Sequence, residues 1–429
     1  MNILVIGNGF DLAHELPTRY NDFLFFCSVV KKIIEDNEVE KKIPKDAKSY
    51  KEWIDNNENI IFKKIDNTIF LINFNSINRK QSEKDKEVFR NMLDNFFKKI
   101  FFEKTIDQKI MKEILYLVFN NFWIDYFLQC DMHGDENWID FESEISNVIQ
   151  SLDESMRSFA LESMIQPTSN SFLNNRYSKL KGQFTYKIVR NKLLNDLNKL
   201  IRAFEIYLCE YVEKIKIQKR SPNIEVLEIN YVFSFNYTKT FSKLYKITKR
   251  RGENEIDSFD YIHGKVNINN TIETNNMVLG IDEYLPDDRK NKDIEFIAFK
   301  KFYQRIYKEI GCKYKEWIDE IREDWRCKND FDKNQLKNQI SRGHSKHNLY
   351  IFGHSLDVTD KDILRDLILN DNVYTTIFYL NKDVMGQQIV NLVKVIGQDE
   401  LIKRTGGSTK TIEFKQQQEM IPINESKDI

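Results

Sequence analysis

Two glycines follow an apolar run at the start of the chain. Residues 3–6 are apolar and partly β-branched, and they lead directly into Gly7, Asn8 and Gly9. A buried parallel strand has such a run, and glycines at its end let the backbone turn sharply and approach a phosphate closely. The third glycine of the dinucleotide-binding motif would fall at Leu12. The pattern alone therefore fits a nucleotide-binding turn and an ordinary turn after a core strand equally well.

Three later segments place asparagine, histidine, glycine or serine at the ends of expected strands. They are residues 235–238 with Asn236, residues 263–264 with His263, and residues 352–357 with Gly353, His354 and Ser355. In an open α/β sheet, ligands bind beyond the carboxyl ends of the strands, so we expect these segments to meet the glycine turn in one crevice. Residues 353–355 would offer backbone N–H groups and a hydroxyl to an anion. Asn381 closes another expected strand and would lie along the same edge.

The elements that must position these residues form an α/β pattern. Glycine and proline are scarce, with 14 and 6 residues, and the middle of the chain has apolar residues at helical spacing. Helices are expected over residues 89–102, 110–128 and 186–215, with a loop at 165–171. Strands are expected at residues 3–6, 224–235, 261–263, 277–280, 349–352 and 374–380. Alternation of such strands with helices predicts a doubly wound, mostly parallel sheet.

This pattern also predicts the domain organisation. We expect residues 1–30 and 221–429 to form a nucleotide-binding α/β core, interrupted by a helical insert at about residues 290–345. Residues 31–220 would form a large helical insertion or cap. The polar tail from residue 416 is expected to be poorly ordered.

Composition excludes several classes of function. Lys and Arg number 65 against 66 Asp and Glu, so the net charge of −1 gives no field that would attract nucleic acid or an anionic membrane. No apolar run is long enough to span a membrane, and the N-terminus lacks the features of a signal peptide, which predicts a cytoplasmic protein. The five cysteines are scattered without a zinc or redox spacing, and no metal site is predicted.

The glycine turn and the three later segments with Asn236, His263 and Gly353 resemble, in order, the pattern of the AbiH family of bacterial abortive-infection proteins. The resemblance rests on residues 7–17, 234–238, 262–264 and 353–358. The same segments look like a diverged form of the sirtuin-type NAD-binding fold, which implies a sirtuin-like Rossmann core. A further AbiH-like segment is Trp138-Ile-Asp-Phe-Glu142. There, Asp140 is expected to cap a helix, and delivery of Glu142 to the site is the alternative.

The resemblance implies specific roles for the crevice residues. Asn236 would orient the nicotinamide ribose or an attacking water, and His263 would act as a general base or as the partner of a ribose hydroxyl. The turn with Gly7, Asn8 and Gly9 would approach the pyrophosphate. The adenosine half would lie against Gly353, Ser355 and Asn381, with His354 beside the crevice. Asp11 stands where sirtuins carry a serine near the phosphates.

The function that follows from the resemblance is that of an antiphage effector. It would bind NAD, or a related nucleotide, as its substrate and hydrolyse the N-glycosidic bond, with a phage-derived trigger and self-association as expected partnerships. Such a reaction passes through an oxocarbenium-like state and suits a histidine base. The alternatives are a non-catalytic nucleotide-sensing or protein-binding module and, with less support, a metal-dependent nuclease. Both proposed catalytic residues also have a purely structural interpretation: Asn236 as a turn residue after a strand, and His263 as a buried core histidine.

Overall fold

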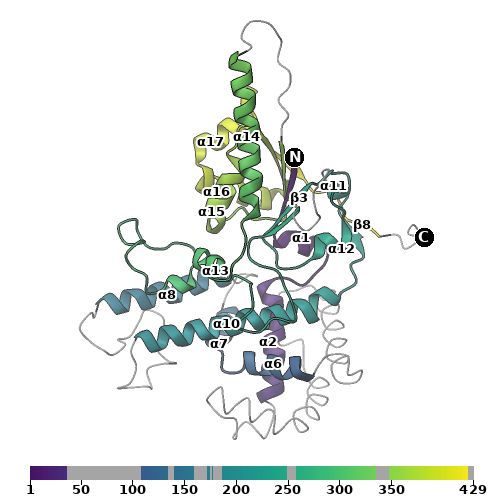
Figure 1. Cartoon of the computed structure of the whole chain (residues 1–429). Helices are drawn as coiled ribbons and strands as arrows, with labels where there is room; N and C mark the ends of the chain where they lie inside the picture. The colour runs from purple at the N-terminus through teal and green to yellow at the C-terminus, as the bar shows by residue number, and fades with distance from the viewer. Residues whose placement is uncertain are drawn as a thin grey trace.

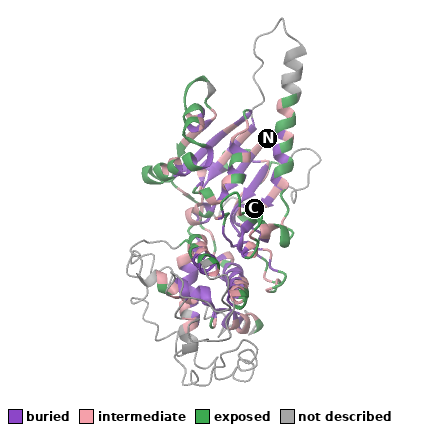
Figure 2. Ribbon diagram, turned by 90° about the vertical axis from the view of Figure 1, so that its left-hand side faces the viewer, coloured by how far each residue is buried: buried purple, intermediate pink, exposed green. Residues whose placement is uncertain are grey.

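The computed structural model describes residues 1–35, 108–133, 140–158, 172–173, 176, 186–248, 258–334 and 347–423. The chain forms a sheet-containing part and a helical block, which lie one above the other in Figure 1. Figure 2 shows a buried interior in each part. The helix expected at residues 89–102, the loop expected at 165–171, and Trp138 lie outside the described residues.

The sheet contains six strands, all parallel to their neighbours. Their order across the sheet is β4 (Phe259–Tyr261), β3 (Tyr231–Ser234), β1 (Asn2–Ile6), β5 (His347–Phe352), β6 (Val373–Tyr379) and β7 (Ile412–Gln416). Counted along the chain, these strands therefore stand in the order 3-2-1-4-5-6, which reverses direction between β1 and β5. This confirms the expected α/β class, and it places β1 at the centre of the sheet.

Both faces of the sheet are covered. Side chains alternate between the two faces along each strand, so neighbouring residues of one strand pack in different apolar clusters. Ile3 and Val5 of β1 pack in one apolar cluster, whereas Leu4 and Ile6 pack in another. The first cluster contains residues of α14 (Lys313–Asn334), α15 (Lys361–Ile368), α16 (Lys382–Ile396) and α17 (Gln398–Thr405). The second contains residues of α1 (Asn8–Ala13), α11 (Pro222–Glu225) and α12 (Thr240–Leu244). The sheet is therefore wound on both sides.

The helical block has an apolar core of its own. Its helices are α2 (Tyr20–Glu35), α6 (Gln108–Val118), α7 (Phe122–His133), α8 (Phe141–Ser158) and α10 (Tyr186–Glu210). Asn120 adopts a positive φ of 49° and separates α6 from α7, where the sequence predicted one helix. Asn121 then starts α7, because its Oδ1 accepts the N–H groups of Trp123 and Ile124 at 3.0 and 3.3 Å.

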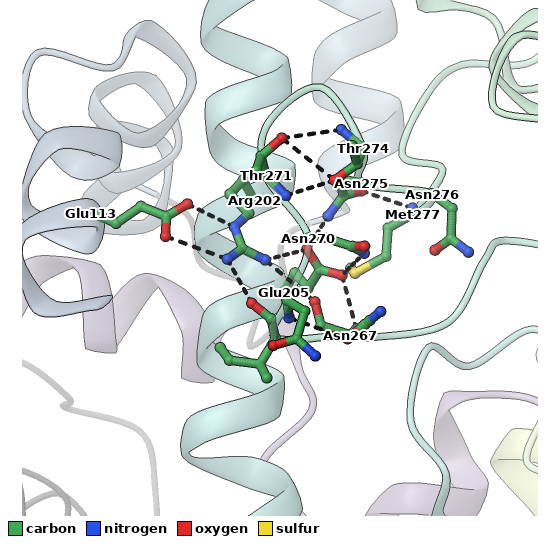
Figure 3. A network of polar contacts seen from close by, with 12 residues as sticks. Glu113, Arg202, Glu205, Asn267, Asn270, Thr271, Thr274, Asn275, Asn276 and Met277 are labelled. Carbon is green, nitrogen blue, oxygen red and sulfur yellow. Dashed lines mark hydrogen bonds and ion pairs between the residues drawn. The ribbon is translucent and has the colours of Figure 1, made fainter. Parts of the chain in front are cut away.

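A buried ion pair fastens the helical block to the loop that follows His263. Arg202 of α10 donates to Glu113 at 2.8 Å and to Glu205 at 2.7 Å, as Figure 3 shows. The Glu205 side chain is fully buried and accepts the backbone N–H of Asn267 at 3.0 Å and the Asn270 amide at 2.7 Å. A buried carboxylate requires such donors, so this network holds residues 267–270 against α10.

The structure corrects two strand predictions. Residues 277–280 are not a strand: the Val278 N–H donates to His263 O at 2.8 Å, and the Leu279 N–H donates to the Gln304 side chain at 3.1 Å. Met277 and Leu279 instead pack into the core of the helical block, which explains their apolar character. The predicted strand at residues 224–235 is confined to β3, because Pro222 opens the helical turn α11 just before it.

The C-terminal region is more regular than the sequence suggests. β7, which the sequence did not predict, adds the edge strand beside β6. Beyond it, β8 (Ile421–Pro422) pairs antiparallel with β2 (Lys219–Arg220), so the expectation of a poorly ordered tail is wrong up to residue 423. Among the described helices, none has the length and apolar character needed to cross a membrane.

Candidate functional site

A cavity of about 530 Å³ lies at the carboxyl ends of the central strands. Residues after β1, β3, β4 and β5 line one side, and residues of the helical block, among them Tyr20, Glu142 and Phe204, line the other. The cavity thus sits where the strand order reverses, which is where open parallel sheets bind ligands. Nine predicted site residues line it: Gly7, Asn8, Gly9, Asp11, Asn236, His263, Gly353, His354 and Ser355.

The glycines join the turns after β1 and β5. The N–H of Gly7 donates to Phe352 O at 3.2 Å, and the N–H of Gly9 donates to Gly353 O at 2.8 Å. Gly353 has a φ of +69°, and a Cβ there would lie 2.1 Å from the backbone nitrogen of Phe10. Gly7, Gly9 and Gly353 must therefore lack side chains for the two backbones to pack together beside the cavity.

Asn236 ties the end of β3 to the same turn. Its Nδ2 donates to Gly7 O at 2.9 Å, and its backbone N–H donates to Ser234 Oγ at 3.1 Å. The side chain is buried but lines the cavity. Asn236 is therefore both a structural link between two strand ends and a group within reach of a bound ligand.

The Asp360 carboxylate lies close to both histidines that line the cavity, His263 and His354. His263 Nε2 lies 3.5 Å from Asp360 Oδ1, and His354 Nε2 lies 3.6 Å from Asp360 Oδ2. His354 Nδ1 accepts the N–H of Leu356 at 2.9 Å, so the proton of the neutral ring is on Nε2, facing the carboxylate. Asp360 is not among the site residues predicted from the sequence. It lies one turn beyond the Gly353 segment, and that spacing is the one signal that could have identified it.

The charges around Asp360 fix its protonation state and that of His263. Burial by itself would raise the pKa of Asp360, but Lys301 and the two histidines outweigh burial and hold that pKa well below its ordinary value. Burial lowers the pKa of His263, against the smaller opposing effect of Asp360. At neutral pH, the site therefore pairs an ionised carboxylate with a neutral imidazole.

Lys301 links Asp360 to a carboxylate from the helical block. Its ammonium lies 2.7 Å from Glu142 Oε2 and 3.5 Å from Asp360 Oδ1. Lys301 begins α13 (Lys301–Tyr307) and is 3% exposed in its side chain. Burial by itself would lower the lysine's pKa, but the charges of Asp360 and Glu142 raise it above its ordinary value, so the lysine is charged. Sequence reasoning missed Lys301, because the chain has many lysine pairs like Lys300-Lys301.

Asp11 lines the cavity and has one carboxylate oxygen without a hydrogen-bond partner. Its Oδ2 accepts the Thr238 hydroxyl at 2.6 Å, while its Oδ1 is buried without a hydrogen-bond partner. Burial raises the pKa of Asp11 to about 6, which the Thr238 hydrogen bond only partly offsets. Glu15, the next carboxylate along the chain, is instead exposed and pairs with Lys219 at 2.5 Å. Of these two carboxylates, Asp11 is the one that faces the cavity.

Replacing Asp11 by asparagine is expected to stabilise the ligand-free protein at pH 8 but not at pH 4. The folded state favours protonated Asp11, so its contribution to stability is present at low pH and is lost as pH rises through about 6. Asparagine cannot ionise, so the variant should avoid this loss and have a free energy of unfolding about 1–3 kcal/mol higher than the wild type at pH 8. Thermal unfolding of both proteins at the two pH values measures the difference, and equal changes in Tm at both would contradict it.

Asn381 does not line the cavity. It is exposed and caps α16, where its Oδ1 accepts the N–H of Val384 at 2.9 Å. The residues that α16 brings to the cavity are Gln387 and Asn391, and Asn391 Nδ2 donates to Ser355 O at 2.9 Å. Asn381 therefore acts on the helix that supports the Ser355 turn.

Replacing Asn381 by alanine should lower the free energy of unfolding by about 1 kcal/mol, the usual cost of a lost N-cap. The affinity of the cavity for a nucleotide should stay the same, because the side chain lies outside it. Urea denaturation and equilibrium binding measure the two quantities. A loss of affinity without a loss of stability would place Asn381 in the binding site after all.

A model of the family described as bacteriophage abortive infection AbiH matches residues 3–122 and 112–380. No curated protein and no solved structure matched the chain. The sirtuin-type resemblance and the NAD chemistry that it implies thus stay predictions. Within the described residues, no group of three or more histidine, cysteine or acidic side chains is arranged to hold a metal ion. The two family matches together span well over half of the sequence, and the chain belongs to the AbiH family of bacteriophage abortive-infection proteins.

Proposed function

We propose that this protein binds NAD, or a closely related nucleotide, in the cavity and hydrolyses its N-glycosidic bond during phage infection. The observation that carries the proposal is the position of the His263–Asp360 pair. The pair lines a cavity at the point where a 3-2-1-4-5-6 sheet reverses its order. Rossmann sheets with this order bind dinucleotides at that point.

The size and lining of the cavity support a nucleotide as the ligand. Its volume of about 530 Å³ falls in the ordinary range for small-molecule sites. Tyr20, Phe204 and Phe235 line it and can pack against the planar rings of a nucleotide. Arg19 is exposed at the cavity and is the lining cation suited to a phosphate, since Lys301 is already paired with two carboxylates.

The residues around Asp360 have the charges that cleavage requires. The nicotinamide of NAD is cationic before the bond breaks, so it leaves as a neutral molecule when the electron pair of the C1′–N bond moves to its ring nitrogen. No acid is needed for this step. The ribose becomes oxocarbenium-like, and the negative charge of Asp360 stabilises it.

Water attacks C1′ in the same transition state, as the C1′–N bond breaks. The water oxygen forms the new bond to C1′, and neutral His263 accepts the proton. The imidazolium that results is stabilised by Asp360, whose Oδ1 lies 3.5 Å from His263 Nε2. Asn236, held by its bond to Gly7 O, orients the ribose or the water.

Metabolite levels in infected cells test this proposal. In cells that the protein protects from phage, NAD should fall after infection while ADP-ribose and nicotinamide rise in equal amounts. Cells that carry an empty vector and receive the same phage are the control. Protection with unchanged NAD would contradict the proposal, and a nucleotide retained by the protein without turnover would favour the non-catalytic sensing module.

A further inference from the structure

The helical block contributes a carboxylate to the reacting end of the cavity. Asp140 caps α8, where its Oδ1 accepts the N–H of Glu142 at 3.0 Å. Phe141 is fully buried between Tyr20 and Phe127, with ring centroids 4.1 Å away on each side. The cap and this aromatic stack fix the first turn of α8. Glu142, the next residue, faces the cavity and Lys301.

Lys301 bridges the two parts of the chain at this point. Its ammonium contacts Glu142 from the helical block at 2.7 Å and Asp360 from the sheet edge at 3.5 Å. Figure 1 shows α13, which Lys301 begins, beside α8 where the helical block meets the sheet-containing part. The Lys301 side chain therefore links Glu142 directly to the Asp360 carboxylate of the His263–Asp360 pair.

Glu142 has fewer charge partners than Asp360. One ammonium faces two carboxylates, and the two histidines both turn to Asp360. Asp360 therefore stays ionised, whereas Glu142 is the carboxylate that gains or loses a proton. In agreement with this, burial raises the pKa of Glu142 to about 7, with the nearby Asp360 charge adding to the effect and Lys301 opposing it. Carboxylates with such different environments commonly have different roles in one site.

We propose that Glu142, in its ionised form, accepts a hydrogen bond from the ribose hydroxyl next to C1′ and so stabilises the developing positive charge. This inference rests on the proposed function and names a catalytic residue outside the sheet edge. A hydrogen bond from that hydroxyl strengthens as the ribose becomes oxocarbenium-like, so it lowers the barrier more than it tightens binding. The helical block would then complete the active site as well as cover it.

Glu142→Gln separates this role from a structural one. The amide is isosteric, and Asp360 still pairs with Lys301, so thermal unfolding should change little. We expect kcat for nicotinamide release from NAD to fall at least about 100-fold while KM changes less than about threefold. The wild-type rate should rise with pH through about 7, because ionised Glu142 is the active form, and the variant should lack that rise.

Glu144→Gln is the matched control. Glu144 lies on the same helix turn, accepts the Tyr126 hydroxyl at 2.7 Å, and does not line the cavity. Its replacement should leave kcat within about threefold of the wild type. A general disturbance of α8 would affect both variants, whereas the proposed role affects Glu142→Gln alone.

An NAD analogue without the 2′-hydroxyl of the nicotinamide ribose tests the contact itself. The loss of kcat caused by Glu142→Gln should be at least about tenfold smaller on this analogue than on NAD, since the hydroxyl partner is missing. An equal loss on both substrates, or a variant within about threefold of the wild type on NAD, would overturn the role of Glu142 and leave the proposed function intact. If the wild type released no nicotinamide at all, the proposed function would fail and this inference with it.

Discussion

Replacing His263 by glutamine is expected to slow nicotinamide release from NAD by a factor of about 10²–10⁴. His263 lines the cavity beside the ionised Asp360, and burial lowers its pKa, so the ring is neutral and able to accept a proton at pH 7. Glutamine keeps much of the volume but cannot take up the proton. Nucleotide affinity should change far less than kcat, which equilibrium binding can show.

The pH dependence separates His263 from Glu142. Because its pKa is lowered, His263 should limit the wild-type rate only below the ordinary histidine value of 6.5. The decrease in rate caused by protonation of Glu142 is centred near pH 7. The plot of log rate against pH should therefore become steeper at lower pH, where His263 is protonated as well.

His14 provides a matched control for the histidine replacement. It lies close to the glycine turn, but its Nδ1 contacts Phe10 O at 2.7 Å and its Nε2 contacts the Tyr245 hydroxyl at 2.8 Å. It does not line the cavity. His14→Gln should therefore lower stability without lowering kcat. Equal losses of kcat in both histidine variants would remove the argument for His263 as the base.

Gly353→Ala should cause a large loss of stability. Gly353 has a φ of +69°, and the new Cβ would lie 2.1 Å from Phe10 N and 2.4 Å from the carbonyl carbon of Gly9. Both neighbours are backbone atoms of α1 just after the central strand β1, so neither can move without separating the turns after β1 and β5. Strained backbone and overpacking together predict a cost of about 2–5 kcal/mol, measured by urea denaturation.

Gly386 in α16 is the control for this replacement. It is exposed, and a Cβ there would meet no atom within 4 Å. Gly386→Ala should raise stability by about 0.5–1 kcal/mol, because alanine favours helix more than glycine does. A Gly353→Ala protein within about 0.5 kcal/mol of the wild type would show that the two turns are not packed as described.

The central strands could be predicted from the sequence because a buried parallel strand has a characteristic composition. β1, β5 and β6 coincide closely with apolar runs that end in polar or glycine residues. The same signal failed at residues 277–280. That segment is apolar because it packs into the helical block, and its backbone bonds to a loop and to Gln304. Periodicity cannot distinguish these two kinds of burial in a short segment.

The structure brings nine of the predicted strand-end residues to one cavity, but other residues that line this cavity were not predicted. Strand-end residues can be identified from sequence because parallel strands bring their carboxyl ends to one edge. Asn381 met that criterion, but β6 lies one strand beyond the point of reversal, and the side chain caps a helix instead. The contacts of Lys301 with Glu142 and Asp360 join three segments far apart in sequence, and no local pattern encodes such contacts.

Product analysis with the purified protein tests the hydrolysis of NAD most directly. The full chain is incubated with NAD, with and without lysate from phage-infected cells, and nicotinamide and ADP-ribose are quantified by chromatography. We expect equal amounts of both products from the wild type and from His14→Gln, and a near-complete loss from His263→Gln. Intact NAD with the wild-type protein, in the presence of lysate from cells infected by a phage against which it protects, would contradict the proposed function.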